Sequence, residues 1–360
     1  MRFIVETGEK VSKFFAEDMQ NIYYKYLFLN EMKEKLKKHK FTIDKDYEYK
    51  SKKYWSKYCK INTMWHSFYS YCNGIKDVRY IPENIYYSKI EPFYNKKSFA
   101  KAIDDKCFYS ERFKGIKLPN IILRNISGNY FDDKFNILSI EDAVDLCYKC
   151  DEFVIKSSID GAGGDSVKFI CPSELNNREE LTEIFHQYEK NFVIQDVIKQ
   201  HGILSSINTS SINTIRFITF LYNGEVHLLS SVLRMGGVGA RVDNFSSGGI
   251  SCGICEDGTL KKVAYDEQYN KYTKHPSGAE FAEIKIPYYG KAVNAVKKQH
   301  VRFGHFRIIS WDIAIDPNGD IILIEFNITP QSIDLHQINN GPLFGDLTDE
   351  VLKDVFSNIK

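Results

Sequence analysis

The sequence has little net charge and lacks a hydrophobic run long enough to cross a membrane. Its 48 Lys and Arg residues almost balance its 47 Asp and Glu residues, so the protein offers no overall field that would attract nucleic acid. The first apolar run, residues 3–5, ends too soon for a signal peptide or a membrane anchor. We therefore expect a cytoplasmic protein that has no transmembrane segment and binds no nucleic acid.

The cysteines do not have the spacing of a zinc site. The chain has eight, among them Cys147-x-x-Cys150 and Cys252-x-x-Cys255, but about a hundred residues separate the two pairs. We interpret them as reduced, mostly buried thiols. No arrangement of Ser, His and Asp or of Cys and His indicates nucleophilic catalysis. Three histidines without an evident partner are interpreted as structural or exposed, namely His201, His227 and His305.

The periodicity of the apolar residues predicts an α+β protein in three parts. Residues 1–100 form a basic, mainly helical region with amphipathic stretches near 11–38 and 51–72 that are interrupted by short polar turns. The second part is residues 101–200 and the third is residues 201–360. The elements expected there are helices over 139–150, 176–190 and 288–300, strands over 152–156, 167–170 and 192–198, and hairpins over 215–221 with 226–234 and over 308–315 with 320–326. Residues 236–253 are too rich in glycine for us to expect regular structure.

The last hairpin carries three oxygen-bearing side chains at the paired ends of its strands. Asp312 lies on the first strand, and Glu325 and Asn327 lie on the second. Mg²⁺ prefers carboxylate and amide oxygens and bridges to the phosphates of a substrate. We therefore predict a magnesium site here. The alternative is that these are ordinary polar residues at strand ends.

A lysine followed by a glycine-rich loop forms a second candidate site. Lys156 ends a strand, and its charge can meet phosphate oxygens while the backbone N–H groups of the loop close over them. The loop has no Gly-Lys-Ser/Thr ending and is therefore not a Walker loop. A flexible hairpin without a ligand is the alternative. The loop residues expected at the phosphates are Ser158, Gly161, Gly163 and Gly164.

The strand over 192–198 is expected to act as a hinge whose backbone reads the edge of an adenine ring. The residues expected there are Gln195, Asp196, Val197 and Ile198. A buried strand that is interrupted by Gln and Asp is also common without any ligand. Its position between the glycine-rich loop and the metal cluster favours the hinge.

In this order, the features resemble the ATP-grasp superfamily over residues 100–335. An Asp-Lys segment at Lys106 comes first, then the strand lysine with its glycine-rich loop, the hinge strand, and a terminal Asp…Glu-x-Asn. A narrower resemblance is to the sugar-transfer-associated ATP-grasp family, which is found with polysaccharide-biosynthesis genes. The segments that carry it are Asn213-Thr-Ile-Arg216, Leu233-Arg-Met-Gly236, Arg241-Val-Asp-Asn-Phe245, Gly248-Gly-Ile250 and Trp311-Asp-Ile-Ala-Ile315.

The resemblance implies an ATP-grasp fold in which two α+β lobes clasp MgATP. It implies that Lys106 and Lys156 hold phosphates and that a carboxylate is activated as an acyl phosphate and joined to an amine, in making a capsule or another bacterial surface glycan. The candidates for gripping the acceptor carboxylate and the phosphoryl group are Arg216, Arg234 and Arg241, with structural ion pairing as the alternative. Two rival functions stay open, a kinase that phosphorylates a hydroxyl of a sugar or glycan precursor, and a nucleotide-binding module without activity.

Positive charge is concentrated at the N-terminus, outside the nucleotide motifs. Residues 1–60 contain 15 Lys and Arg residues but nine Asp and Glu residues. We predict that this charge serves the acceptor, which is a small molecule or linked to a glycan, or makes a weak contact with a glycan carrier or an anionic membrane surface. A solvated helical face is the alternative. The lysines expected to form this surface are Lys35, Lys37, Lys38 and Lys40.

Overall fold

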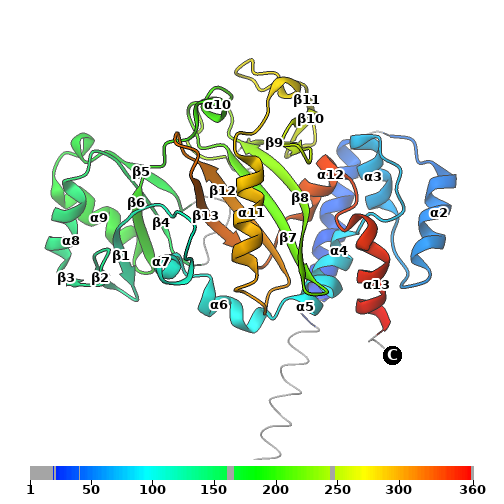
Figure 1. Cartoon of the computed structure of the whole chain (residues 1–360), viewed down its shortest axis with the longest axis horizontal. Coiled ribbons are helices and arrows are strands. Elements are labelled where there is room, and N and C mark those ends of the chain that lie inside the picture. Colours follow the sequence, from blue (N-terminus) through cyan, green and yellow to red (C-terminus); the bar gives the residue numbers. More distant parts are fainter. Residues whose placement is uncertain (1–18, 20–21, 40, 160–165, 244–247, 358–360) are drawn as a thin grey trace, which may run out of the picture.

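The computed structural model describes residues 19, 22–39, 41–159, 166–243 and 248–357, and it has the predicted α+β class (Figure 1). Two antiparallel sheets lie side by side, and helices of the N-terminal region, together with the C-terminal helices, lie on the side of the second sheet away from the first (Figure 1). Within the described residues, none of the helices combines the length and the hydropathy that a bilayer span requires.

The first sheet contains six strands in the order β3-β2-β1-β6-β4-β5. The strands are β1 (Ile121–Ile126), β2 (Asn129–Phe131), β3 (Ile137–Leu138), β4 (Phe153–Ser157), β5 (Lys168–Ile170) and β6 (Phe192–Asp196). Two helices, α8 (Ile140–Tyr148) and α9 (Arg178–Tyr188), close its core, in which Leu123 and Phe185 are fully buried. The Ser139 hydroxyl accepts from the backbone N–H of Asp142 at 3.1 Å, so the start of α8 is capped as its sequence predicts.

The second sheet contains seven strands in the order β11-β10-β9-β8-β7-β12-β13. The strands are β7 (Thr214–Tyr222), β8 (Glu225–Met235), β9 (Ile250–Ile254), β10 (Leu260–Asp266), β11 (Lys271–Tyr272), β12 (Ile308–Ile315) and β13 (Ile321–Asn327). Asn223 and Gly224 both have positive φ, 49° and 80°, which is the backbone that the Asn-Gly pair predicts for a hairpin turn. Alternate residues of β7 face opposite ways. Phe217 packs in one hydrophobic core with α11 (Tyr289–His300), whereas Ile218 packs in another with the N-terminal region.

The expectation for residues 236–253 was wrong at its C-terminal end. Ile250 and Cys252 are buried and pair with Met235 and Leu233, so the last residues of the glycine-rich stretch extend the sheet as β9. Apolar side chains at alternate positions outweigh the low strand propensity of glycine here. A Cβ added to Gly253 would lie 2.4 Å from the Asn340 side chain, so this glycine permits the close approach of α12 (Ile333–Asn340).

The described part of the N-terminal region is helical, as predicted. Its elements are a helix over 22–38, α2 (Lys45–Trp55), α3 (Met64–Asn73), α4 (Glu83–Ile85), a π-helical turn (Tyr86–Ile90), α5 (Glu91–Tyr94) and α6 (Ala100–Ile103). The amphipathic stretch expected near 51–72 is divided by a turn, because α2 ends at Trp55 and α3 begins at Met64. Of two short helices, α7 (Tyr109–Arg112) precedes the first sheet and α10 (Gly202–Ser205) lies between the two sheets in the sequence. The last described helix is α13 (Thr348–Ser357).

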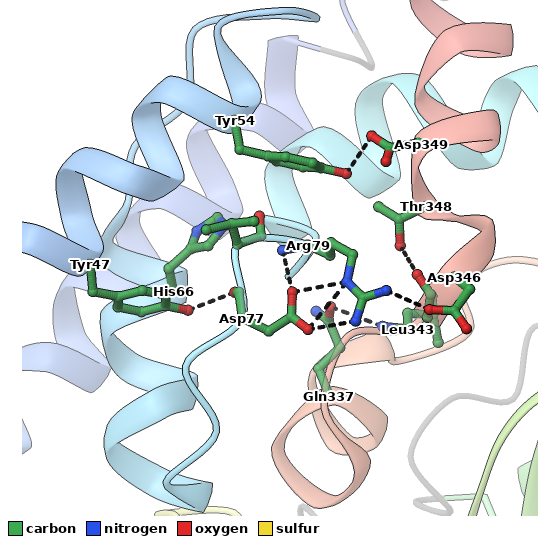
Figure 2. Close-up of polar contacts among 12 residues, drawn as sticks. Tyr47, Tyr54, His66, Asp77, Arg79, Gln337, Leu343, Asp346, Thr348 and Asp349 are labelled. Atoms are coloured by element: carbon green, nitrogen blue, oxygen red, sulfur yellow. Dashed lines mark hydrogen bonds and ion pairs between the residues drawn. The ribbon is translucent and has the colours of Figure 1, made fainter.

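The N-terminal region is held to α12 and α13 by polar contacts between segments far apart in the sequence (Figure 2). Arg79 donates to Asp346 at 2.7 Å and pairs with Asp77 at 2.8 Å. The buried Gln337 of α12 accepts from the backbone N–H of Ile81 at 2.8 Å and donates to the carbonyl of the same residue at 2.9 Å. One side chain therefore satisfies two buried backbone groups of the other region.

Gln337→Ala should lower the free energy of unfolding by about 1–3 kcal/mol, because it leaves the N–H and C=O of Ile81 buried without partners. Urea unfolding followed by tryptophan fluorescence measures the change. Gln187→Ala is the control, since Gln187 accepts only from the exposed Lys168, and its effect should stay within about 0.5 kcal/mol. Equal losses in the two variants would contradict the docking role of Gln337.

Candidate functional site

A cavity of about 720 Å³ lies between the two sheets. It is lined by β4, β5 and β6 on one side, by β7, β8, β12 and β13 on the other, and by the start of α12. The predicted site residues that line it are Lys106, Lys156, Gln195, Asp196, Val197, Ile198, Arg216, Arg234, Arg241, Asp312, Glu325 and Asn327. The fold therefore brings together residues that lie more than two hundred positions apart.

The predicted loop residues are placed differently. Gly161, Gly163 and Gly164 lie outside the described residues. The side chain of Ser158 is fully buried and does not line the cavity. Its carbonyl accepts from the backbone N–H of Lys106 at 3.0 Å, so Ser158 fixes the segment that carries one of the two cavity lysines.

A row of charged residues crosses the second sheet at the cavity. Arg216 is the register partner of Asp312, and Asp312 is the partner of Glu325, so the three side chains share one face of β7, β12 and β13. Arg216 binds Asp312 with two parallel hydrogen bonds, 2.7 Å from Nε to Oδ1 and 2.6 Å from Nη2 to Oδ2. The predicted hairpin thus presents its acidic side chains toward the cavity, and Asp312 is already paired with a positively charged side chain.

Asp312 stays ionised although it is buried. Burial acts to raise its pKa, but the charges of Arg216 and Arg234 and a contact with the Asn327 amide outweigh it and hold the pKa below its ordinary value. Arg234 donates from Nη1 to Asp312 Oδ2 at 3.2 Å and pairs with Asp243 at 3.5 Å. Both arginines are therefore held by ion pairs, and a bound anion would meet guanidinium groups that are already oriented.

The two cavity lysines differ in charge environment. Burial acts to lower the pKa of Lys106, but Glu325, which contacts Nζ at 2.8 Å, raises it above its ordinary value. The pKa of Lys156 is lowered to about 8 by burial and by the charge of Lys106, with a smaller opposing effect of Glu325. Lys106 is thus compensated within the protein, whereas the protonated form of Lys156 gains from any anion that enters the cavity.

The hinge strand is shorter than expected. β6 ends at Asp196, and Val197 and Ile198 follow it, so they lie beyond the ladder of the sheet while still lining the cavity. Gln195 is buried, and its Oε1 atom has no hydrogen-bond partner. Asp196 is exposed and accepts from Asn120 at 2.8 Å. Polar groups beside the apolar walls are thus free to meet the edge of a planar ring.

The acid row fits a hard divalent cation. Asp312 and Glu325 are cross-strand neighbours on the cavity face, and Asn327 lines the same cavity, where its amide oxygen could join them as a ligand. Each carboxylate oxygen can accept more than one contact, so the pairs with Arg216 and Lys106 leave room for a cation. Among the described residues, no cluster of three His, Cys, Asp or Glu side chains is arranged for a metal, so an amide and water would complete the set.

Arg241 extends from the second lobe to the first. Its Nη2 atom lies 2.5 Å from Glu152 Oε1, and its guanidinium lies 4.2 Å from the centre of the Phe169 ring. Both partners belong to the lobe of the six-stranded sheet. Asp243, two residues later, contacts Arg234 and the Thr214 hydroxyl instead. Residues 241–243 therefore link the lobe of the six-stranded sheet to the row of charged residues on the second sheet.

Sequence reasoning missed the wall formed by α12. Asp334 lines the cavity, and its carboxylate lies 3.4 Å from Lys35 Nζ and 3.1 Å from the Tyr269 hydroxyl. Lys35 also lies 4.0 Å from the buried Glu83, whose pKa burial raises to about 7 against the opposing effect of Lys35. No local motif marks these residues, because three distant segments meet here. His336, fully buried behind the row, donates to or accepts from Ser230 at 2.8 Å.

The predicted lysine surface was wrong for Lys35, which faces this buried cluster. Lys37 pairs with Glu34 at 2.6 Å, Lys38 is exposed, and Lys40 lies outside the described residues. The three histidines of the sequence analysis are far from any catalytic arrangement. His201 caps α10, His227 lies half-buried on β8, and His305 stacks on Phe99 at 4.1 Å.

Comparison with known proteins identifies the family. The model of the family described as "Sugar-transfer associated ATP-grasp" matches residues 86–352, and no curated protein matches. Similar solved structures include D-cycloserine synthetase DcsG, with 12% identity over 69% of this chain and 70% of that chain and a TM-score of 0.41. D-alanyl-alanine synthetase A from Vibrio cholerae has 12% identity over 73% and 66%, with a TM-score of 0.42. N5-carboxyaminoimidazole ribonucleotide synthetase, solved as an ADP complex, has 9% identity and a TM-score of 0.39. The match covers 64% of this chain and only 45% of that chain.

Reversing the charge of Arg241 should loosen the contact between the lobes. Arg241→Glu and Glu152→Arg each replace an attraction by a repulsion. An exposed ion pair of this kind contributes up to about 1 kcal/mol, which corresponds to about a fivefold change in the protection of backbone amides against hydrogen exchange. The rate of hydrogen–deuterium exchange at β5 and at residues 150–152 should rise in each single variant and should return to the wild-type rate in the double reversal. Reversal of the exposed pair Lys285–Asp257, within one lobe, is the control. Persisting fast exchange in the double variant would argue against the pair.

Proposed function

Because the chain belongs to the sugar-transfer associated ATP-grasp family, we propose that it is an ADP-forming ligase that uses MgATP to join a carboxylate to an amine. The observation that carries the proposal is the charge pattern of the cavity. Lys106 and Lys156 face it from one side, and the row of Arg216, Asp312 and Glu325 faces it from the other. Cations for phosphate oxygens and acids for a metal thus meet in one cavity.

The adenine would lie between the sheets against the hinge. Val154 and Ile324 are apolar residues of the two facing walls, and Gln195 and the backbone of residues 197–198 supply polar contacts at the edge of the ring. Lys156, at the end of β4, would then meet the phosphate chain. Burial and the charge of Lys106 disfavour the protonated form of Lys156. A bound phosphate would favour this form, because its negative charge attracts the ammonium group.

A magnesium ion held by Asp312, Glu325 and Asn327 would supply positive charge at the phosphates. The protein residues around it have separate tasks. Arg216 keeps the Asp312 carboxylate oriented and ionised, and Lys106, whose Nζ lies 2.8 Å from Glu325, holds the Glu325 side chain in place. The acid row is thus preorganised, because its side chains are fixed before any ligand enters.

The transfer itself requires an acceptor carboxylate in line with the γ-phosphorus. An acceptor oxygen forms a bond to phosphorus as ADP leaves, and the acyl phosphate is then attacked at carbon by an amine, with release of phosphate and a proton. Arg234 lies at the cavity beside Asp312 and Asp243 and is placed to orient the carboxylate. Arg241 contributes by keeping the lobes together, since its guanidinium is bound to the opposite lobe. We place this reaction in the biosynthesis of a bacterial surface glycan, on the basis of the family.

The proposal predicts ADP release that depends on an acceptor carboxylate. A screen of uronic acids, amino acids and nucleotide sugars, with and without amines, should reveal stimulated release, and hydroxylamine should trap a hydroxamate detected by mass spectrometry. Glu325→Gln should lose most of the stimulated rate at limiting Mg²⁺, because an amide lacks the negative charge that the ion needs. Detection of a phosphorylated hydroxyl instead of a hydroxamate would contradict the ligase proposal and would identify the reaction as that of a kinase.

The pKa of Lys156 predicts how nucleotide affinity depends on pH. The affinity for MgADP should fall by about tenfold between pH 7 and pH 9, because a lysine with a pKa of about 8 loses its proton in this range and the protonated form binds phosphate. Binding should also take up a proton, which calorimetry in buffers of different ionisation enthalpy detects. Lys156→Arg keeps its charge and should remove the dependence. A dependence that persists in this variant would place the titrating group elsewhere, since Lys106 stays protonated throughout.

A further inference from the structure

A surface remote from the nucleotide motifs combines exposed aromatic rings with exposed lysines. Three segments form it, the start of the helix over 22–38, residues 86–99 with α5, and the turn 302–307 after α11. We call it the lysine–aromatic face. Figure 1 shows α5 and α6 along the lower edge of the molecule, beside the tip of the β7–β8 hairpin.

The three segments are joined into one surface by direct contacts. The Lys97 ammonium lies 5.3 Å from the centre of the Tyr24 ring, which ties residues 86–99 to the N-terminal helix. Phe99 stacks on His305 with ring centres 4.1 Å apart, and the backbone N–H of Lys96 donates to the His305 carbonyl at 2.9 Å. A groove of about 550 Å³ that includes Phe93 and Arg307 opens between the last two segments.

Apolar side chains are unusually exposed on this face. Phe93 is 38% exposed, Phe99 44% and Tyr23 61%. Ile22 and Tyr26 of the N-terminal helix are also exposed. Burial of such side chains in the folded chain would have been favourable, so their exposure on joined segments marks a surface that meets a partner.

The charge of the face is one-sided. Lys25, Lys89 and Lys96 are exposed. Among the described residues of the three segments, Glu91 is the single carboxylate, and it is 1% exposed and paired with Lys97 at 2.7 Å. The exposed Glu225, at the tip of the neighbouring hairpin, lies at the rim. The whole chain has a net charge of only +1, so positive charge is concentrated here.

We propose that the lysine–aromatic face docks on an anionic lipid bilayer. Aromatic rings and lysines are the side chains that settle at the membrane–water interface, where the rings enter the headgroup layer and the ammonium groups meet lipid phosphates. A second copy of the chain fits less well, because a symmetric contact would bring the same lysines face to face. The inference goes beyond the proposed reaction, since it concerns where the enzyme works and needs no catalysis.

Co-sedimentation of the full chain with vesicles tests the proposal. The protein should bind vesicles that contain phosphatidylglycerol, should bind pure phosphatidylcholine vesicles far less, and should be released by high salt. Combined Lys25→Gln, Lys89→Gln and Lys96→Gln should weaken binding at least about tenfold. The matched control is Lys134→Gln, Lys149→Gln and Lys190→Gln, three exposed lysines of the six-stranded lobe, and it should bind as the wild type does.

A second variant separates the aromatic contribution from the charge. Phe93→Ser with Phe99→Ser should weaken vesicle binding even at low salt, with unchanged thermal unfolding as the check that the chain is folded. The proposal is overturned if the wild type does not bind anionic vesicles, or if the two triple-lysine variants bind equally. It is also overturned if sedimentation velocity shows a dimer that the Lys25, Lys89 and Lys96 variant disperses.

Discussion

The buried ion pair between Arg216 and Asp312 is the constraint from which the site follows. Two charges removed from water at the middle of a sheet are tolerated only with good geometry, and here the strand register places them directly opposite each other. Loss of Asp312 would leave Arg216 without its hydrogen-bonded carboxylate, and loss of Arg216 would leave Asp312 with Arg234 as its remaining ion-pair partner. The register of β7, β12 and β13 is therefore tied to the position of the acids, because a shift of one residue would turn the row toward the opposite face.

Further charged side chains continue from this pair across the cavity, and the last of them is a lysine. Asp312 is balanced by Arg216 and Arg234, and the neighbouring Glu325 is balanced by Lys106 from the other lobe. Lys156 comes last, and the repulsion of Lys106 together with burial lowers its pKa. The folded chain thus carries a deficit of negative charge at one point of the cavity. An anionic ligand relieves it, which is a physical reason for anion binding that does not depend on any family resemblance.

Sequence reasoning succeeded where the signal is local. The strand over 308–315 follows from its apolar run, the turn at Asn223-Gly224 follows from backbone preference, and the acids of the last hairpin follow from their spacing. It failed where the signal is a meeting of distant segments. Lys35 belongs to a basic helix by composition, yet Glu83 and Asp334 draw it inward. Which arginine binds Asp312 depends on strand register, and no single segment encodes that choice.

The segment of Arg241 and Asp243 shows why the separate predictions for the three arginines could not stand alone. Arg241 binds Glu152 in the other lobe, and Asp243 binds Arg234, which binds Asp312 in turn. Residues 241–243 therefore connect Glu152 of the six-stranded lobe to Arg234, and through Arg234 to Asp312, by three ion pairs. An acceptor that contacts Arg234 would meet a guanidinium whose position depends on residues of both lobes, so the contribution of each arginine has to be considered together with the partners of the other two.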